Sequence, residues 1–138
     1  MEFPLDQGKA ILSAKISISS ARADFLATSC EVGPTPLEVR ALIDTGASIS
    51  IVDEEYLGAL RIYPRGFCDV LSFHNEESTP RKFQNYDIDL EILGRQFKNL
   101  QVVGARLMST HFQMLLGRDI LVNFDYSFLN SKDTFQID

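Results

Sequence analysis

The sequence predicts a mostly β protein with one or two short helices. The clearest support is the period-two pattern from Tyr86 to Ile92, in which apolar and acidic residues alternate. Other extended stretches are separated by turns rich in Gly, Pro and Asn. Segments with helical spacing are few and short: Ser50–Leu60 is weakened by Gly58, and Gly117–Leu121 is brief.

In the first third of the chain we expect antiparallel strands. Ile11–Ser20 alternates, and Asp24–Val32 is expected to continue it as a β-hairpin or meander that ends at the turn Gly33–Pro36. Leu37–Ile43 alternates at first and then becomes wholly apolar. This pattern is typical of a strand that runs from an exposed rim into the core.

The rest of the chain continues in the same way. Phe67–Phe73 and an extended segment from Lys82 are expected to form a hairpin with a polar tip at His74–Pro80. The strand Tyr86–Ile92, with one face exposed to water, should turn at its end into a further strand. The remaining expected elements are the strands Phe97–Val103, Phe112–Leu116, Tyr126–Leu129 and Thr134–Ile137, with a short helix at Gly117–Leu121.

Length and charge restrict the function classes. The chain has 138 residues, 45% hydrophobic, which suits one domain spanning residues 1–138. Its 19 acidic and 13 basic residues give a net charge of −6 without a Lys/Arg cluster, which argues against nucleic acid as a partner. No apolar run approaches the roughly 20 residues of a membrane span, and Met1–Ala10 has no secretory signal pattern, so we expect a cytoplasmic protein.

No cofactor or metal is expected. Cys30 and Cys68 are far apart and belong to no Cys/His cluster, so we expect buried thiols that are not linked in a disulfide. Asp87, Asp89 and Glu91 share one strand face, which would suit a cation, but a solvated sheet face is the commoner meaning. The Gly-containing segments match no nucleotide-binding pattern.

The strongest motif is Ala41–Ser48, an apolar strand that delivers Asp44 into a tight Thr-Gly turn. A carboxylate directly after a buried strand is partly desolvated, as a catalytic acid or base requires. Gly46 permits close backbone approach or a positive φ, and the Thr45 hydroxyl is able to bond to nearby main chain. A turn that merely ends a strand is the alternative for so short a string.

Two motifs together resemble the retropepsin-like aspartic proteases, the single-domain relatives of retroviral proteases and pepsin. Leu42–Ser48 is similar to their active-site strand and loop. Met114–Leu121 is similar to the apolar-Gly-Arg-Asp element that precedes their C-terminal helix. Between the two, Leu71–Pro80 occupies the place of the flap that closes over substrate. The resemblance extends from about Ile11 to Ile137 and implies a closed β-barrel of the retropepsin type.

The resemblance also implies a homodimer. Pepsin-type chemistry needs two carboxylates facing one water, and the chain has a single Asp-Thr-Gly. Asp44 of each subunit would therefore lie at a two-fold axis. Because like charges so close together cannot both be ionised, the two carboxylates would share a proton and titrate as a pair. One would act as base on the water and the other as acid toward the scissile carbonyl.

By the same resemblance, the residues of the turn have separate roles. Asp44, Thr45 and Gly46 form the catalytic turn: Thr45 would bond across the dimer, and Gly46 would bring main chain close to the substrate backbone. Ala47 and Ser48 would line the substrate cleft.

Four further residues are implied outside that turn. Gly117 and Arg118 would support the active-site loop from behind. In retroviral relatives an acidic residue pairs with this Arg, but the present chain has Ser48 at that position, so the partner of Arg118 is open. An exposed cation at a helix start is the alternative for Arg118. Phe73 and His74 would contact substrate from the flap. The flap tip lacks the glycines of retroviral versions, on which its closing motion would depend, and the alternative is that both are ordinary hairpin residues.

The function expected from these motifs is an aspartic endopeptidase, a hydrolase that cleaves peptide or protein substrates in a cleft shared by two subunits. The alternative is a non-catalytic dimeric module of the same fold that holds an extended peptide by β-addition. The intact Asp44-Thr45-Gly46 sequence favours the enzyme.

Overall fold

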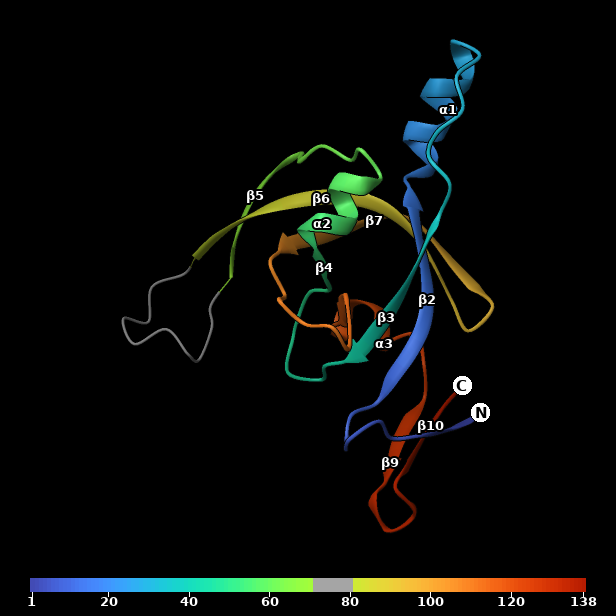
Figure 1. The fold of residues 1–138 in the computed structure, drawn as a ribbon, viewed down its shortest axis with the longest axis vertical. Helices are drawn as coiled ribbons and strands as arrows, with labels where there is room; N and C mark the ends of the chain where they lie inside the picture. The colour runs from blue at the N-terminus through green and yellow to red at the C-terminus, as the bar shows by residue number, and fades with distance from the viewer. Residues whose placement is uncertain (71–80) are drawn as a thin grey trace.

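The computed structural model describes residues 1–70 and 81–138 (Figure 1). The strands are β1 (Glu2–Pro4), β2 (Ile11–Ile18), β3 (Leu37–Ile43), β4 (Ile51–Asp53), β5 (Gly66–Val70), β6 (Arg81–Ile92), β7 (Arg95–Ala105), β8 (Met114–Leu116), β9 (Tyr126–Leu129) and β10 (Thr134–Ile137). The helices are α1 (Ser20–Thr28), α2 (Glu54–Ala59), α3 (Arg118–Leu121) and the 3₁₀-helix η1 (Asn130–Lys132). None of the helices in these two ranges is long and apolar enough to span a bilayer.

Six strands close into a mixed barrel, as the resemblance to retropepsin-like proteases implies. The sheet runs β2-β3-β8-β4-β7-β6, and a further pairing of β2 with β6 joins its two ends. The β3–β8 and β4–β7 pairs are parallel, and the other pairs in the ring are antiparallel. β5 pairs with the first part of β6 and lies outside the ring. Closure leaves few exposed strand edges.

The two ends of the chain form a separate three-stranded sheet of order β1-β10-β9. Figure 1 places both termini beside β10, at the end of the molecule where β9 also lies. Phe3 of β1 and Phe135 of β10 stack with their ring centroids 5.3 Å apart. Phe135 is 1% exposed, so this sheet shares the hydrophobic core of the barrel.

The barrel interior is filled by the apolar faces of the strands. Tyr86, Ile88, Leu90 and Ile92 are all buried, which confirms the period-two prediction for β6. The acids that alternate with them are half-buried or exposed. The turn Leu93–Gly94 joins β6 to β7, and both residues have positive φ, as a two-residue hairpin turn of type I′ requires.

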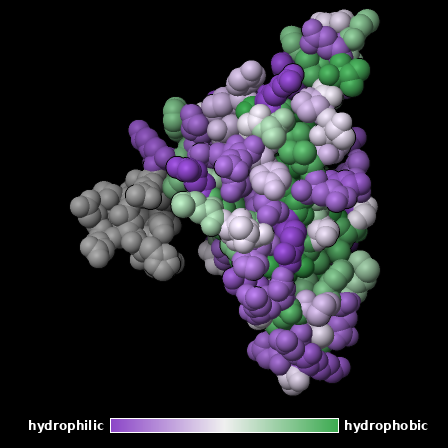
Figure 2. Space-filling model, in the orientation of Figure 1, coloured by the Kyte–Doolittle hydropathy of each residue, from purple (hydrophilic) through white to green (hydrophobic). Residues whose placement is uncertain are grey.

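The expected strand at Asp24–Val32 is wrong, because α1 takes its place. Ser19 begins the helix by accepting a hydrogen bond from the Arg22 amide at 3.1 Å. The carboxylate of Asp89 on β6 binds the Ser20 amide at 2.9 Å, so the sheet itself anchors the helix start. No residue of α1 is buried, and Figure 2 shows apolar side chains on the surface around it. The prediction of a strand relied on the apolar pair Phe25-Leu26, and both residues lie in α1 instead.

Most other elements follow their predictions with small shifts, but the strands β1 and β4 were not predicted. Ser50–Leu60 divides into β4 and α2, where Asp53 caps the helix by accepting from the Glu55 amide at 3.0 Å. The tip of the expected hairpin at His74–Pro80 lies outside the described residues.

The expectation of buried thiols is not met, since Cys30 is exposed and Cys68 only partly buried. Partial burial, with Asp69 beside it, raises the pKa of the Cys68 thiol.

Candidate active site

Asp44 is placed by a parallel pair of strands. β3 and β8 run side by side, with Ile43 opposite Leu116, so both strands end at the same level of the barrel. The Asp44 amide donates to the Leu116 carbonyl at 3.0 Å, one step beyond the last paired residues. The two sequence motifs, about seventy residues apart along the chain, are therefore neighbours in the structure. The side chain of Asp44 is half-buried, as expected after a buried strand.

The loop after Asp44 curls back on its carboxylate. The Gly46 amide donates to Asp44 Oδ1 at 3.1 Å, and the Ala47 amide donates to the Asp44 carbonyl at 3.2 Å. Thr45, Gly46 and Ser48 are exposed and Ala47 is half-buried, so the loop faces outward. Gly46 has no positive φ, and a Cβ at this position would meet only Asp44 Oδ1, at 3.4 Å.

A buried hydrogen-bond network holds this loop against the second motif. Ser50 is fully buried, and its Oγ donates to Asp119 Oδ1 at 2.7 Å while its amide donates to Asp119 Oδ2 at 3.0 Å. The same Oγ accepts from the Gly117 amide at 3.0 Å. The Arg118 amide donates to the Ala47 carbonyl at 2.8 Å. Four hydrogen bonds thus hold the segment that carries Asp44 to the start of α3.

Ser50 and Asp119 were not singled out from the sequence. Asp119 lies inside the apolar-Gly-Arg-Asp motif, but its partner lies 69 residues away. The available signal was a Ser between Ile49 and Ile51, a small polar residue in an otherwise apolar run before a strand. A buried hydroxyl at such a position needs a partner.

Arg118 contributes through its main chain. Its side chain is exposed, and within residues 1–70 and 81–138 it makes no hydrogen bond or ion pair. In this chain, the bracing contacts to the loop come from Asp119 and the Gly117 and Arg118 amides. Phe73 and His74, expected on the flap, lie outside the described residues.

We expect Ser50→Ala to lower the free energy of unfolding by about 1–3 kcal/mol, because it leaves the buried Gly117 amide without its acceptor. Urea unfolding followed by circular dichroism measures the change. Ser48→Ala is the matched control: Ser48 is exposed, and the loss there should stay within about 0.5 kcal/mol. Equal stabilities of the two variants would contradict the bracing role of Ser50.

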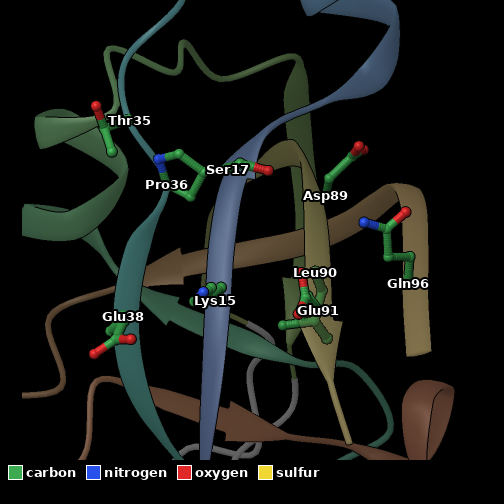
Figure 3. A pocket seen from close by; sticks show the side chains of 9 residues that line it. All are labelled: Lys15, Ser17, Thr35, Pro36, Glu38, Asp89, Leu90, Glu91 and Gln96. Atoms are coloured by element: carbon green, nitrogen blue, oxygen red, sulfur yellow. The ribbon is translucent and has the colours of Figure 1, made fainter. Parts of the chain in front are cut away.

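The groove in Figure 3, of about 520 Å³, lies elsewhere. It lies over the outward faces of β2, β3 and β6, where Lys15 is paired in register with Glu38 on one side and Glu91 on the other. Such an arrangement of opposite charges on neighbouring strands stabilises a sheet. None of the residues that line it belongs to the Asp44 loop. Among the described residues, no group of His, Cys, Asp and Glu side chains is arranged to hold a metal ion.

Comparisons with solved structures identify the fold. A retropepsin-like aspartic protease from Rickettsia conorii superposes with a TM-score of 0.58 at 17% identity, over 98% of this chain and 86% of that one. The simian foamy virus (mac) protease gives a TM-score of 0.51 at 17% identity, over 82% and 92% of the two chains. At the level of sequence, the chain matches no protein-family model and no curated protein. The barrel, its strand order and these superpositions together establish that the chain has the retropepsin-like fold.

Proposed function

We propose that the chain is an aspartic endopeptidase that works as a homodimer, with the Asp44 carboxylates of two chains facing one water. The observation that carries the proposal is the position of Asp44: a half-buried carboxylate at the end of β3, on a loop held to β8 and α3 by hydrogen bonds. Support also comes from the fold, which proteases of Rickettsia conorii and simian foamy virus share.

The proposed chemistry follows from two carboxylates that share one proton. The ionised Asp44 removes a proton from the water, whose oxygen attacks the scissile carbonyl carbon. The protonated Asp44 of the other chain gives its proton to the carbonyl oxygen, which forms a tetrahedral diol. As the carbon–nitrogen bond breaks, the leaving amine takes up the proton that the first Asp44 removed from the water, the other Asp44 takes back a proton from the diol, and a carboxylic acid remains. No covalent intermediate with the protein is formed.

A second copy is required because the chain contains one Asp-Thr-Gly turn. A two-fold arrangement places the same loop of each chain at the axis. Exposed and half-buried residues of that loop are suited to this: Thr45 would bond to its counterpart, Gly46 would bring main chain close to the substrate backbone, and Ala47 and Ser48 would line the cleft. Gly117 and Arg118 would support the loop from behind, and Phe73 and His74 would contact substrate from the flap.

The test is cleavage of a diverse peptide library from acidic to neutral pH, with the products identified by mass spectrometry. We expect internal cleavage at a limited set of sequences by the native chain, and none by the Asp44→Asn chain purified in parallel. Sedimentation analysis of both preparations checks that they associate equally. Two inert, dimeric preparations would refute the endopeptidase and favour a peptide-binding module. Equal cleavage by both would show that Asp44 is not the catalyst.

A further inference from the structure

A second candidate binding site lies at the end of the barrel away from Asp44. A cavity of about 220 Å³, partly open to solvent, lies between the junction of β2 with α1 and the segment that follows α2. Because β2 and β3 are antiparallel, Ile18 at the end of β2 is at the opposite end of the pair from Asp44. Figure 1 shows α1 extending from this end, while β3 points its arrowhead toward the other. The cavity is therefore separate from the proposed active site.

Arginines dominate the charge of this cavity. Arg22 of α1 lines it together with Arg61 and Arg65 from the segment after α2, and Asp87 of β6 is the one acid. Asp87 is already engaged in an ion pair with Arg65. Within the described residues, neither Arg22 nor Arg61 forms an ion pair, and Arg22 lies over the Phe25 ring at 5.5 Å. With Arg65 offset by Asp87, Arg22 and Arg61 leave an excess of positive charge here, in a chain of net charge −6, which makes this spot complementary to an anion.

The same cavity has apolar walls. Ile18 is 9% exposed, and it lines the cavity with the half-buried Ile62. Tyr63, also in the lining, is 74% exposed. Arg and Tyr are enriched in the residues that contribute most to binding at protein interfaces. A ligand for this cavity would combine a negative charge with an apolar group.

A second cavity extends the groove along β6. It has a volume of about 300 Å³, shares Arg65 and Asp87 with the first, and is also lined by Asn85 and Gln101. Asn85 is 8% exposed, and its side-chain oxygen has no hydrogen-bond partner among residues 1–70 and 81–138. A buried amide oxygen without a partner is costly, and an N–H group of a bound chain would satisfy it after a rotation of the Asn85 side chain toward the groove. A row of cations, apolar walls and a hydrogen-bond acceptor matches an extended peptide better than a small ion.

We propose that this groove, defined by Arg22, Arg61, Arg65 and Asn85, binds an acidic peptide segment of a protein partner. Carboxylates of the peptide bond to Arg22 and Arg61 at its open end. An apolar side chain beside them packs on Ile18, and an N–H group of the peptide donates to the Asn85 oxygen. Nucleic acid fits less well, because phosphate-backbone binding uses many cations over a wide surface and this groove offers two beyond the Arg65–Asp87 pair.

The test is fluorescence anisotropy with a labelled peptide in which Glu alternates with Phe and Leu. The comparison peptide carries Gln in place of every Glu, and mass spectrometry after each titration checks that both stay intact. We expect binding of the acidic peptide that weakens as salt is added. The double variant Arg22→Gln/Arg61→Gln should lower the affinity about tenfold, because charge-assisted hydrogen bonds are lost. Both side chains are exposed, so the fold should tolerate the change.

The matched control is Lys9→Gln/Lys132→Gln, which removes the same charge from exposed positions near the terminal sheet. It should change the affinity less than about twofold, as expected for distant, screened charges. In ¹H–¹⁵N spectra the peptide should shift the Asn85 side-chain amide and the amides of residues 61–65. Equal binding of the Gln peptide, an equal loss in the control variant, or shifts confined to other residues would overturn the proposal. Equally tight binding of a short single-stranded RNA would identify a general polyanion surface instead.

Discussion

Asp44→Asn is expected to lower kcat/KM for peptide cleavage at least about a thousandfold, because general acid–base catalysis by a positioned carboxylate contributes on this scale. This corresponds to about 4 kcal/mol of transition-state stabilisation. The Asn side-chain amide is not a base and cannot take a proton from the water, so the dimer has no carboxylate to act as general base. The fold should remain, since the Asn oxygen is able to accept the Gly46 hydrogen bond that Asp44 Oδ1 accepts. Steady-state kinetics on a peptide selected from the library, with circular dichroism on both chains, measures both effects.

Mixed dimers test whether the two carboxylates act together. If native and Asp44→Asn chains exchange freely in equal amounts, about a quarter of the dimers carry two native chains. Activity should therefore fall to about a quarter of that of the same total amount of native chain, because the hybrids are inactive. Native mass spectrometry with one chain ¹⁵N-labelled verifies the exchange. A fall to only one half would mean that each chain is catalytic by itself.

Gly117→Ala is expected to cost both stability and activity. A Cβ at this position would lie 2.7 Å from the Ile49 carbonyl carbon and 2.8 Å from its oxygen. These are backbone atoms of the segment that carries Asp44, so the segment must move. Forcing one extra carbon into such packing costs about 1–3 kcal/mol. The displacement of the Asp44 loop should also lower kcat/KM, by about a hundredfold relative to the native chain, as misplacement of a catalytic group by about 1 Å does.

Gly58→Ala provides the control for Gly117→Ala. Gly58 lies in α2, and a Cβ there meets no atom within 4 Å. Ala in a helix interior should stabilise the protein by about 0.5–1 kcal/mol and leave the kinetics unchanged. Urea unfolding and peptide cleavage are measured on both variants. Native stability and native activity in Gly117→Ala would contradict the close packing of the Asp44 loop on the start of α3.

Much of the fold could be predicted from local patterns. The alternation in β6 identifies which of its faces is buried, because a strand exposes alternate side chains. The apolar end of β3, followed by Asp44, indicates a carboxylate at the end of a core strand, and the structure has it half-buried there. These features depend on residues that are neighbours in the chain, so the period of the apolar pattern is sufficient to predict them.

α1 could not be predicted in this way. Five of its nine residues are apolar, but they do not gather on one helical face, so the sequence shows no helical stripe, and none of them is buried. What anchors its start is the Asp89 carboxylate on β6, 69 residues away, which binds the amide and hydroxyl of Ser20. Local propensity agrees with the helix, because Ala, Leu and Arg are strong helix formers and Ser19 is a favoured N-cap residue, so the strand prediction weighed the Phe25-Leu26 pair too heavily.

By itself, the sequence determined the mostly β class, most of the strands and the single Asp-Thr-Gly turn on which the proposed chemistry depends. Only the tertiary structure decided which strands close the barrel, and that Ser50 and Asp119 hold the Asp44 loop in place. It also brought Arg22 beside Arg61 and Arg65. The physical reason is the same in each case: periodicity reports which face of an element is buried, whereas a hydrogen bond or a cavity depends on the partner across the fold.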